Sequence, residues 1–576
     1  MPKAPSTAKT GKSAKSAAKA KASPPKKVVL DPVTVGKDGA TMGHVEARFN
    51  RFQNKNTFWR HTQNGTMGDF DAAFDAAMGR LRGTGLGKTY TLVIDGKPVK
   101  APTFSTKSPA DHRLVVGKWA SGTREHARAA VAAAKKGYPA WSATPWQKRA
   151  AILEKAADLF TTHFYDLCAV MSVEAGKTRY EASIDVDEAV DFLRFYALTM
   201  REMNGFDMEM GKPVPTEACR SIRKPWGVFA VVCPFNFPIA ITAGMTAAAL
   251  VTGNTAVLKP SGKGCLSGWW VFDLLRQAGV PASALHFLTA ADHDISTELL
   301  TSPDVDGLVF TGSKRIGMMA WQKAAEHGRP KPMIAEMGGK NAIVVSDKAD
   351  LDKAVQGVFR SAFGFQGQKC SACSRVYVHQ KVAKEFTERL AKLTEAARVG
   401  TPWTKESYMG PVIDESKAAF YDELVTGIKA QGGKAIAGGK RVTKDEQASL
   451  VGNYVRPTVV TGLPLDHRVF REEFFMPFLA LGVVKSFEDG IAEANKAEYG
   501  LTAGCFTEDS KEAQRFFDTI EAGVTYLNRA AGGSTAAVVN GQAFVGWKNS
   551  GSTGNGAGGR YYLLQFTREQ ARTIAG

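Results

Sequence analysis

A run of residues without a single charged side chain, residues 227–258, constrains the fold of this chain more than any other feature of its sequence. The run is long enough in principle to cross a bilayer. Residues that favour turns interrupt it near both ends: Pro234, Asn236, Pro238, Gly253 and Asn254. The uninterrupted apolar helix between them has only about a dozen residues, which is too short for a membrane span.

The uncharged run instead divides into three buried segments of alternating type. These are a strand at 228–232, a helix at 239–251 and a second strand at 255–258. Strand and helix segments continue to alternate after them, with further strands at 307–310 and 342–345. This order predicts an α/β fold with a doubly wound, Rossmann-like parallel sheet.

The segments before this run indicate helices that cover the sheet. Apolar residues have helical spacing at 70–81, 123–138, 146–160 and 186–200. Strands at 90–94 and 98–104 flank Asp95-Gly96, which predicts a hairpin. A helical module of its own is the alternative, and it is weaker because a parallel sheet needs cover on both faces.

Length and cysteine content suggest the domain number and the compartment. A chain of 576 residues exceeds the size at which a single core keeps growing, so at least two domains are expected. Seven cysteines are an odd and sparse set for this length. They argue against a disulfide framework and favour a reducing compartment, by default the cytoplasm.

The net charge of +18 is concentrated at the N-terminus, where eight lysines lie within residues 1–30 and no acid precedes Asp31. Residues 1–32 are therefore expected to form a disordered basic tail. The tail lacks the apolar core of a secretory signal and the arginines of a transit peptide. It is either simply solvated or an arm for a polyanion such as nucleic acid, an acidic protein or anionic lipid.

Residues 363–375 (FGFQGQKCSACSR) place two cysteines among glycine, glutamine and hydroxyl residues. So polar a segment predicts a loop that presents a thiol rather than a buried apolar side chain. A metal site is not expected, because zinc needs four ligands and no second suitably spaced pair occurs. Glycines and Gln368 precede the C-x-x-C pair, which argues against a thioredoxin-type redox site. From spacing alone, a nucleophilic and a structural cysteine both remain open.

The pattern G-Q-x-C-x-A-x-S-R at 367–375 resembles the active-site signature of the aldehyde dehydrogenase superfamily. The resemblance extends over roughly residues 80–576, with five motifs in the family's order. It implies that Cys370 is the nucleophile and that Cys373 occupies a tolerant position. It also implies the family's fold, with an NAD-binding domain, an α/β catalytic domain and a small β oligomerisation element.

Two further motifs of the family supply partners for the nucleophile. Glu336 lies in E-x-G-G-K-N, which is similar to the family's general-base motif, and Asn236 matches the asparagine that donates to the oxyanion. Taken alone, these residues would be a capping glutamate and a turn asparagine. The implied reaction begins with attack of the Cys370 thiolate on an aldehyde and ends with hydrolysis of a thioester by water that Glu336 activates.

The resemblance also implies a dinucleotide, with NAD expected and NADP open. Glycine at a strand-to-helix junction can cradle a phosphate, although by itself it is weak evidence, because glycines also make turns. The residues implied to bind the cofactor are Lys259, Ser261, Gly312, Ser313, Glu473 and Phe475. Ser261 stands where many members have a glutamate, and serine is more permissive toward a 2′-phosphate. Met476 replaces a glycine beside Phe475.

Three details resemble one branch of the superfamily: F-G-F-x-G-Q-K-C-S-A-C-S-R at 363–375, E-A-x-D-F at 188–192, and Ser534-Thr535 followed by A-x-V. That branch oxidises L-glutamate γ-semialdehyde, the open form of 1-pyrroline-5-carboxylate. The residues implied to bind substrate are Ser371, Phe237, Phe544, Ala536 and Ala537. Ala536 replaces a glycine of the anchor loop, and Val545 also departs from the pattern. A general or different semialdehyde dehydrogenase is the alternative, and a non-catalytic scaffold is a remote third hypothesis.

The resemblance divides the chain into four parts. Residues 1–32 are the tail, and residues 338–551 are the catalytic domain. The NAD-binding domain comprises 33–206 and 226–337. The oligomerisation element comprises 207–225 and 552–576, with a closing strand near 561–567 suited to contacts in a homodimer or a higher homo-oligomer.

Overall fold

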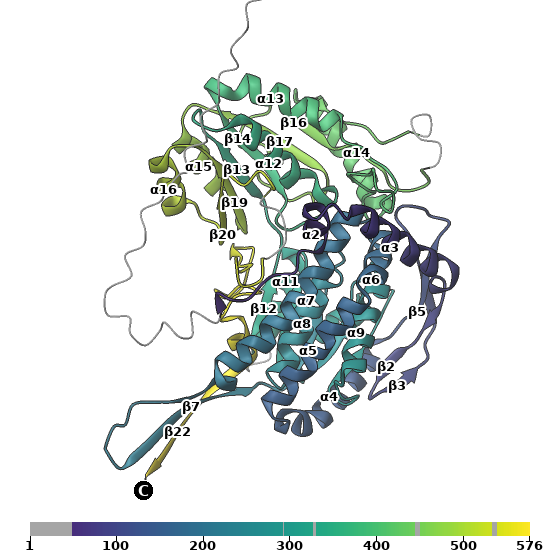
Figure 1. Cartoon of the computed structure of the whole chain (residues 1–576), viewed down its shortest axis with the longest axis vertical. Helices are drawn as coiled ribbons and strands as arrows, with labels where there is room; N and C mark the ends of the chain where they lie inside the picture. The colour runs from purple at the N-terminus through teal and green to yellow at the C-terminus, as the bar shows by residue number, and fades with distance from the viewer. Residues whose placement is uncertain (1–48, 292, 327–329, 444–449, 533–537, 576) are drawn as a thin grey trace, which may run out of the picture.

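The computed structural model describes residues 49–291, 293–326, 330–443, 450–532 and 538–575. Two seven-stranded sheets, each covered by helices, form its two lobes (Figure 1). The basic tail and the anchor-loop residues Ala536 and Ala537 lie outside the described residues. None of the helices in the described part has the length and apolarity needed to traverse a bilayer.

The first sheet contains the strands that the uncharged run predicts. Its order is β12 (Met333–Glu336), β11 (Gly307–Thr311), β8 (Val228–Val232), β9 (Thr255–Lys259), β10 (Leu285–Phe287), β2 (Leu92–Ile94) and β3 (Lys97–Val99). The strands from β12 to β10 are parallel, whereas β2 pairs antiparallel with β10 and forms a hairpin with β3. The doubly wound sheet is therefore confirmed.

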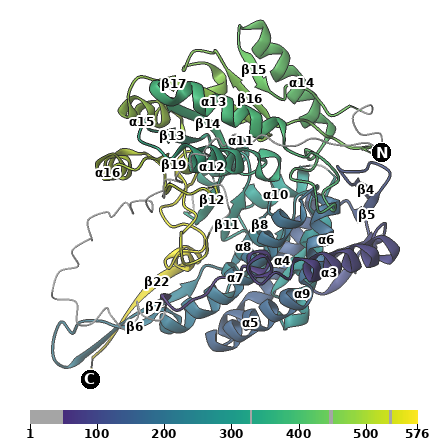
Figure 2. The same cartoon turned by 45° about the horizontal axis from the view of Figure 1, so that its top comes forward.

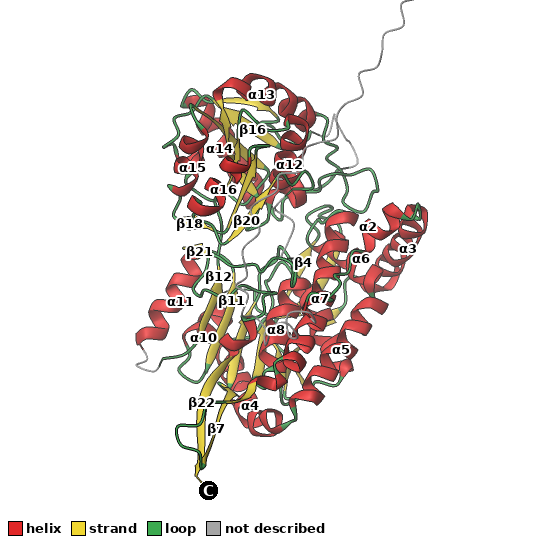
Figure 3. Ribbon diagram, turned by 60° about the vertical axis from the view of Figure 1, so that its left-hand side comes forward, coloured by secondary structure: helices red, strands yellow, loops and turns green. Residues whose placement is uncertain are grey.

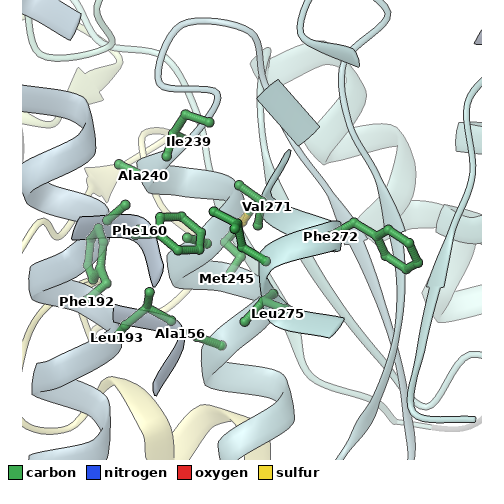
Figure 4. Close-up of a cluster of buried hydrophobic side chains, with 14 of the residues drawn as sticks. Ala156, Phe160, Phe192, Leu193, Ile239, Ala240, Met245, Val271, Phe272 and Leu275 are labelled. Atoms are coloured by element: carbon green, nitrogen blue, oxygen red, sulfur yellow. The ribbon is translucent and has the colours of Figure 1, made fainter. Parts of the chain in front are cut away.

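The two faces of this sheet bury different residues of each strand, which explains why the central strand β8 carries no charged residue. Phe229 and Val231 of β8 face a core built from α5 (Trp146–Thr162), α6 (Phe164–Glu174), α7 (Arg179–Glu202), α8 (Ala240–Val251) and α9 (Cys265–Ala278). Figure 4 shows part of this core, where side chains of α5, α7, α8 and α9 interdigitate. Val228, Ala230 and Val232 face α4 (Arg124–Ala143), α10 (Asp294–Thr301) and α11 (Lys314–Glu326).

The second sheet repeats this arrangement in the other lobe. Its order is β15 (Lys434–Ala437), β16 (Thr458–Thr461), β17 (Phe478–Val484), β14 (Cys373–His379), β13 (Asn341–Val345), β19 (Thr502–Phe506) and β20 (Val524–Leu527). All neighbours are parallel except β15 with β16. Ile343 and Val345 face α12 (Leu351–Phe363) and α13 (Gln380–Glu395). Ala342 and Val344 face α14 (Glu415–Ala430), α15 (Phe487–Asn495) and α16 (Ser510–Thr519).

The chain crosses from one sheet to the other between Glu336, the last residue of β12, and Asn341, the first of β13. The predicted domain boundaries, including the one at residue 338, stay a prediction. Since β8, β9, β11 and β12 are parallel, their carboxyl ends all lie at one edge of the first sheet. That edge is where ligands bind in open α/β sheets.

A third sheet projects from the first lobe (Figures 1 to 3). It has the order β22 (Thr567–Ala575), β7 (Glu217–Pro225) and β6 (Asp207–Glu209). The strand predicted at 561–567 is wrong in its position, because residues Tyr562–Phe566 form a 3₁₀ turn and the strand begins only at Thr567. The turn buries the adjacent residues Tyr562 and Leu563, together with Phe566. A strand would not bury an adjacent pair on one side, because its successive side chains point to opposite faces.

The N-terminal hairpin is shorter than predicted. Only β2 and β3 flank Asp95-Gly96, while Tyr90 lies in β1 (Thr89–Tyr90) and Phe104 in β4 (Thr103–Lys107). Both of these strands pair with β5 (Val115–Ala120) in a separate sheet, where the Tyr90 ring stacks on Trp119 at 4.3 Å. A local pattern shows that a segment is extended but not which strand it joins.

The predicted helices are confirmed, with shifted ends. Residues 70–81 correspond to α3 (Met67–Arg80), and α7 begins at Arg179 instead of Val186. The sequence pattern missed α6 because that helix is buried on almost all sides and lacks amphipathic spacing.

Candidate active site

The segment that carries the two cysteines was predicted to be a loop that presents a thiol, and it is largely buried except at the partly exposed Cys370. It follows α12 as a short turn, η3 (Gly364–Gly367), in which Phe365 (φ 47°) and Gln366 (φ 56°) adopt left-handed backbone. Some of the polar groups are paired inside the protein: Gln366 Nε2 donates to the carbonyls of Gly176 (3.0 Å) and Pro411 (2.7 Å), whereas Gln366 Oε1 and Gln368 Nε2 have no hydrogen-bond partner among the described residues. The polar composition of the segment therefore did not predict its burial, because distant backbone groups supply partners that water would otherwise provide.

The two cysteines have different surroundings. Cys373 is the first residue of β14, is buried, and donates from Sγ to the Arg375 carbonyl at 3.3 Å. Cys370 is partly exposed and opens into two cavities. Burial raises the pKa of the Cys370 thiol above its ordinary value, and the Glu473 and Glu336 carboxylates add to the effect. No cluster of His, Cys, Asp or Glu suited to a metal occurs among the described residues.

The larger cavity is a cleft of about 820 Å³ at the carboxyl ends of the strands of the first sheet. It is lined by all the residues implied to bind the cofactor, together with Asn236: Lys259, Ser261, Gly312, Ser313, Glu473 and Phe475. The residues lie along it from the β9 end, past the start of α11, to the neighbourhood of Cys370. The size of the cleft and this series of residues fit a dinucleotide.

The turn of Gly312 and Ser313 has a backbone that suits a phosphate. Helix α11 begins at Lys314, so its first turn directly follows Gly312 and Ser313. A helix start provides free N–H groups and positive potential for a phosphate. The Gly312 N–H donates to the Glu336 carbonyl at 3.1 Å, which ties this turn to the end of β12.

Glu473 and Phe475 belong to the second lobe and line the larger cleft from that side. The Glu473 carboxylate accepts from the Gly339 N–H at 2.9 Å, and burial raises its pKa to about 7. Phe475 has left-handed backbone (φ 58°), and its ring packs edge-on against Phe235 at 5.8 Å. Met476, which replaces a glycine, is buried and leaves this contact in place.

The smaller cavity, of about 50 Å³, lies on the other side of Cys370. Four predicted residues line it: Glu336, Ser371, Phe237 and Phe544. The Glu336 carboxyl is buried, and its Oε2 has no hydrogen-bond partner among the described residues. Burial raises the pKa of Glu336 well above its ordinary value, while a hydrogen bond from the Gly546 backbone opposes that shift. A carboxyl in this state is suited to take a proton near neutral pH.

Other residues that line the smaller cavity were not predicted. They include Glu188, Phe192 and Tyr196 of α7, Met245 of α8 and Tyr562 of the 3₁₀ turn η5 (Tyr562–Phe566). Glu188 is buried, and its Oε2 has no hydrogen-bond partner in the described ranges. The sequence did contain a signal for Glu188, which lies three residues after Asp185 on a helix rich in apolar residues. Carboxyl groups on the buried side of a helix are costly to desolvate, so two of them together indicate a specific role.

A sequence profile described as "Aldehyde dehydrogenase family" matches residues 97–571. This chain belongs to the aldehyde dehydrogenase family. The dehydrogenase is 36% identical over 500 residues to 1-pyrroline-5-carboxylate dehydrogenase 2 of Bacillus subtilis (strain 168), and the match covers 85% of this chain and 93% of that protein.

Solved structures of relatives share the fold of this aldehyde dehydrogenase. The Thermus 1-pyrroline-5-carboxylate dehydrogenase with bound NAD is 32% identical, with a TM-score of 0.83, over 91% of this chain and 99% of that one. Proline utilization A from Bdellovibrio bacteriovorus is 33% identical, also with a TM-score of 0.83, over 88% of this chain. This dehydrogenase spans only 52% of that longer protein.

Proposed function

We propose that this enzyme oxidises L-glutamate γ-semialdehyde to L-glutamate with NAD. The observation that carries the proposal is the position of Cys370, which opens both into a dinucleotide-sized cleft and into a small chamber lined by Glu336. The Bacillus and Thermus relatives are named for 1-pyrroline-5-carboxylate, the cyclised form of this aldehyde.

The reaction begins at Cys370. Its thiolate adds to the carbonyl carbon of the aldehyde, because the thiolate and not the thiol is the nucleophile. The Asn236 side-chain amide and the Cys370 backbone N–H donate to the oxygen that becomes negative, each worth about 3 kcal/mol to the barrier. Asn236 is buried beside the same cleft, which restricts the motion of that amide.

Glu336 acts after the adduct has been oxidised to a thioester on Cys370. Its carboxylate removes a proton from water, and the resulting hydroxide attacks the thioester carbon and releases the carboxylic acid and the free thiol. The carboxyl lies in the smaller cavity with an unpaired oxygen among the described residues, so it has the capacity to hold this water.

The cofactor would lie in the larger cleft. Lys259 and Ser261 would contact its adenosine ribose, Gly312 and Ser313 its phosphates, and Glu473 its second ribose. When bound, NAD supplies the hydride acceptor. Ser261 carries no charge, so it does not repel a 2′-phosphate and leaves NADP as a second cofactor.

The substrate would occupy the smaller cavity. Phe237 and Phe544 offer apolar walls for the methylenes, and Ser371 offers polar contacts for the α-carboxylate. Glu188 supplies a buried carboxyl that can accept from the α-ammonium group. Ala536 and Ala537, the implied anchor-loop contacts, remain part of the proposal, although they lie outside the described residues.

We also propose a cytoplasmic homo-oligomer. All seven cysteines are unpaired, as a reducing compartment requires. β22 is an edge strand of the projecting sheet and exposes most of its residues, so a second copy can pair with it.

The substrate assignment can be tested by comparing kcat/KM for glutamate γ-semialdehyde, succinic semialdehyde and hexanal. The first should be preferred over hexanal by on the order of 10⁴-fold, because hexanal leaves the polar groups of the pocket unpaired. NADH formation measures all three. If hexanal were the best substrate, the carboxylate-binding pocket would be refuted and the enzyme would be a general aldehyde dehydrogenase.

A further inference from the structure

Lys177 is fully buried between α6 and α7, outside both cavities of the active site. Its Nζ lies 3.0 Å from the Asp185 carboxylate, whose side chain is equally inaccessible. The same Nζ lies 3.6 Å from the ring centroid of Phe237 and 4.3 Å from that of Phe365. The ammonium is therefore held between two aromatic rings that belong to different loops.

We propose that Lys177 is a positioning residue, which sets the distance between the loop of Asn236 and the turn that leads to Cys370. The proposal rests on the function proposed above, because it assigns Lys177 to the geometry of the same site. It does not depend on which aldehyde the enzyme prefers.

The first contact of Lys177 reaches the loop between β8 and α8. Phe237 lines the smaller cavity and directly follows Asn236. Asp185, the ion-pair partner of Lys177, holds the other end of this loop. Its Oδ1 accepts from the N–H of Ala240, the first residue of α8, at 2.6 Å. The Lys177–Asp185 pair thus fixes the loop both through a ring and through a backbone amide.

The second contact reaches the turn before the nucleophile. Phe365 and Gln366 both have left-handed backbone, which costs roughly 1–2 kcal/mol for each residue and persists only where the surroundings impose it. Lys177 lies against the Phe365 ring, and the carbonyl of its neighbour Gly176 accepts from Gln366 Nε2 at 3.0 Å. Residues 176–177 therefore hold two consecutive residues of the strained turn.

A parallel ion pair supports the segment closer to the nucleophile. Lys369, the residue before Cys370, lies 2.6 Å from the Glu181 carboxylate, and both side chains are buried. Glu181 and Asp185 are four residues apart on α7, so one face of this helix reaches both loops. On the same face, Glu188 lines the smaller cavity.

A purely structural ion pair is the competing explanation. Burying two charges costs about as much as their attraction returns, so a neutral pair of similar size is often no less stable. Lys177→Met alone or Asp185→Asn alone leaves one buried charge unpaired and is expected to destabilise the fold. The double variant Lys177→Met/Asp185→Asn removes both charges and separates stability from positioning.

In the double variant we expect thermal stability to stay close to that of the wild type, while kcat falls about 10- to 100-fold because the reacting groups are misplaced. The Kd for NAD should not change, since neither residue lines the larger cleft. Each variant is assayed with the aldehyde that the wild type uses best, so an error in the substrate assignment does not affect the result. A stable double variant with wild-type kcat would overturn the proposal.

Two comparisons complete the test. Arg149→Met is the matched control, because Arg149 is also buried but, within the described residues, donates only to backbone carbonyls, including that of Val251 at 2.8 Å. It should lower stability and leave the kcat of the folded enzyme unchanged.

Phe237→Leu removes one of the two rings that contact Lys177, so its effect on kcat should be less than additive with that of the double variant. Full additivity would show that Lys177 does not act through Phe237.

Discussion

Asn341 Nδ2 donates to the Cys370 carbonyl at 2.7 Å and to the Ala372 carbonyl at 2.9 Å. Its Oδ1 accepts from the Thr502 N–H at 2.9 Å, which fixes the orientation of the amide. The first residue of β13 thereby ties the backbone of the nucleophile to the second sheet.

Asn341→Asp should lower kcat by about 10- to 100-fold, because a carboxylate cannot donate to the two carbonyls and repels them. Single-turnover NADH formation measures the loss. Asn495→Asp is the matched control, since Asn495 also bridges a carbonyl (Thr519, 2.8 Å) and an N–H (Glu521, 2.9 Å) but lies away from the site. Equal losses in both variants would argue against a specific role for Asn341.

Cys370→Ala should abolish dehydrogenase activity, whereas Cys373→Ala should retain most of it. Only Cys370 opens into both cavities; Cys373 is packed in the core beside β14. Steady-state kinetics and iodoacetamide labelling followed by peptide mapping check this difference. Comparable loss of kcat in two folded variants would favour a redox pair.

Glu336→Gln should release one equivalent of NADH for each active site and then stall as an acyl-enzyme. In the wild type, hydrolysis of that acyl-enzyme should accelerate as pH rises through a range well above the ordinary carboxyl pKa. Only the deprotonated carboxylate accepts a proton from water, so the rate of hydrolysis rises with pH. Burial raises the pKa of Glu336, so this rise occurs at a higher pH than for an ordinary carboxyl. Rapid-mixing measurements across pH give both results, and a rate of hydrolysis independent of pH would refute Glu336 as the base.

Glu188→Gln should reduce kcat/KM for glutamate γ-semialdehyde by about 10- to 100-fold, the value of one hydrogen bond to a charged group. The effect on succinic semialdehyde, which has no amino group, should be small. The ratio of the two specificity constants is the readout, since a general disturbance of the pocket lowers both. An unchanged ratio would show that Glu188 does not contact the ammonium group.

Ser261→Glu should shift cofactor preference toward NAD. A carboxylate at this edge of the larger cleft accepts from ribose hydroxyls and repels a 2′-phosphate, so KM for NADP should rise while KM for NAD stays the same or falls. The ratio of kcat/KM for the two cofactors measures the change, with Ser261→Gln as the uncharged control. Equal ratios for Glu and Gln would exclude an electrostatic origin.

The sequence alone predicted strands β8, β9 and β11 at the centre of the first sheet, and a family motif predicted Cys370 as the nucleophile. Strands buried on both faces carry no charge, so residues 227–258 revealed β8, α8 and β9 almost to the residue. Motifs local in sequence also predicted roles for Cys370, Glu336 and Asn236, because each lies in a short pattern of distinctive residues. Such patterns depend only on near neighbours along the chain.

The tertiary structure alone decided which distant groups meet. Lys177 contacts Phe237 and Phe365, which lie far from it in the sequence, and Glu188 lines the same cavity as the equally distant Cys370. The same holds for the burial of the 363–375 segment, whose glutamines find their partners in remote backbone. A sequence records which groups need partners, but only packing of the helices and sheets determines which partners come within hydrogen-bonding distance.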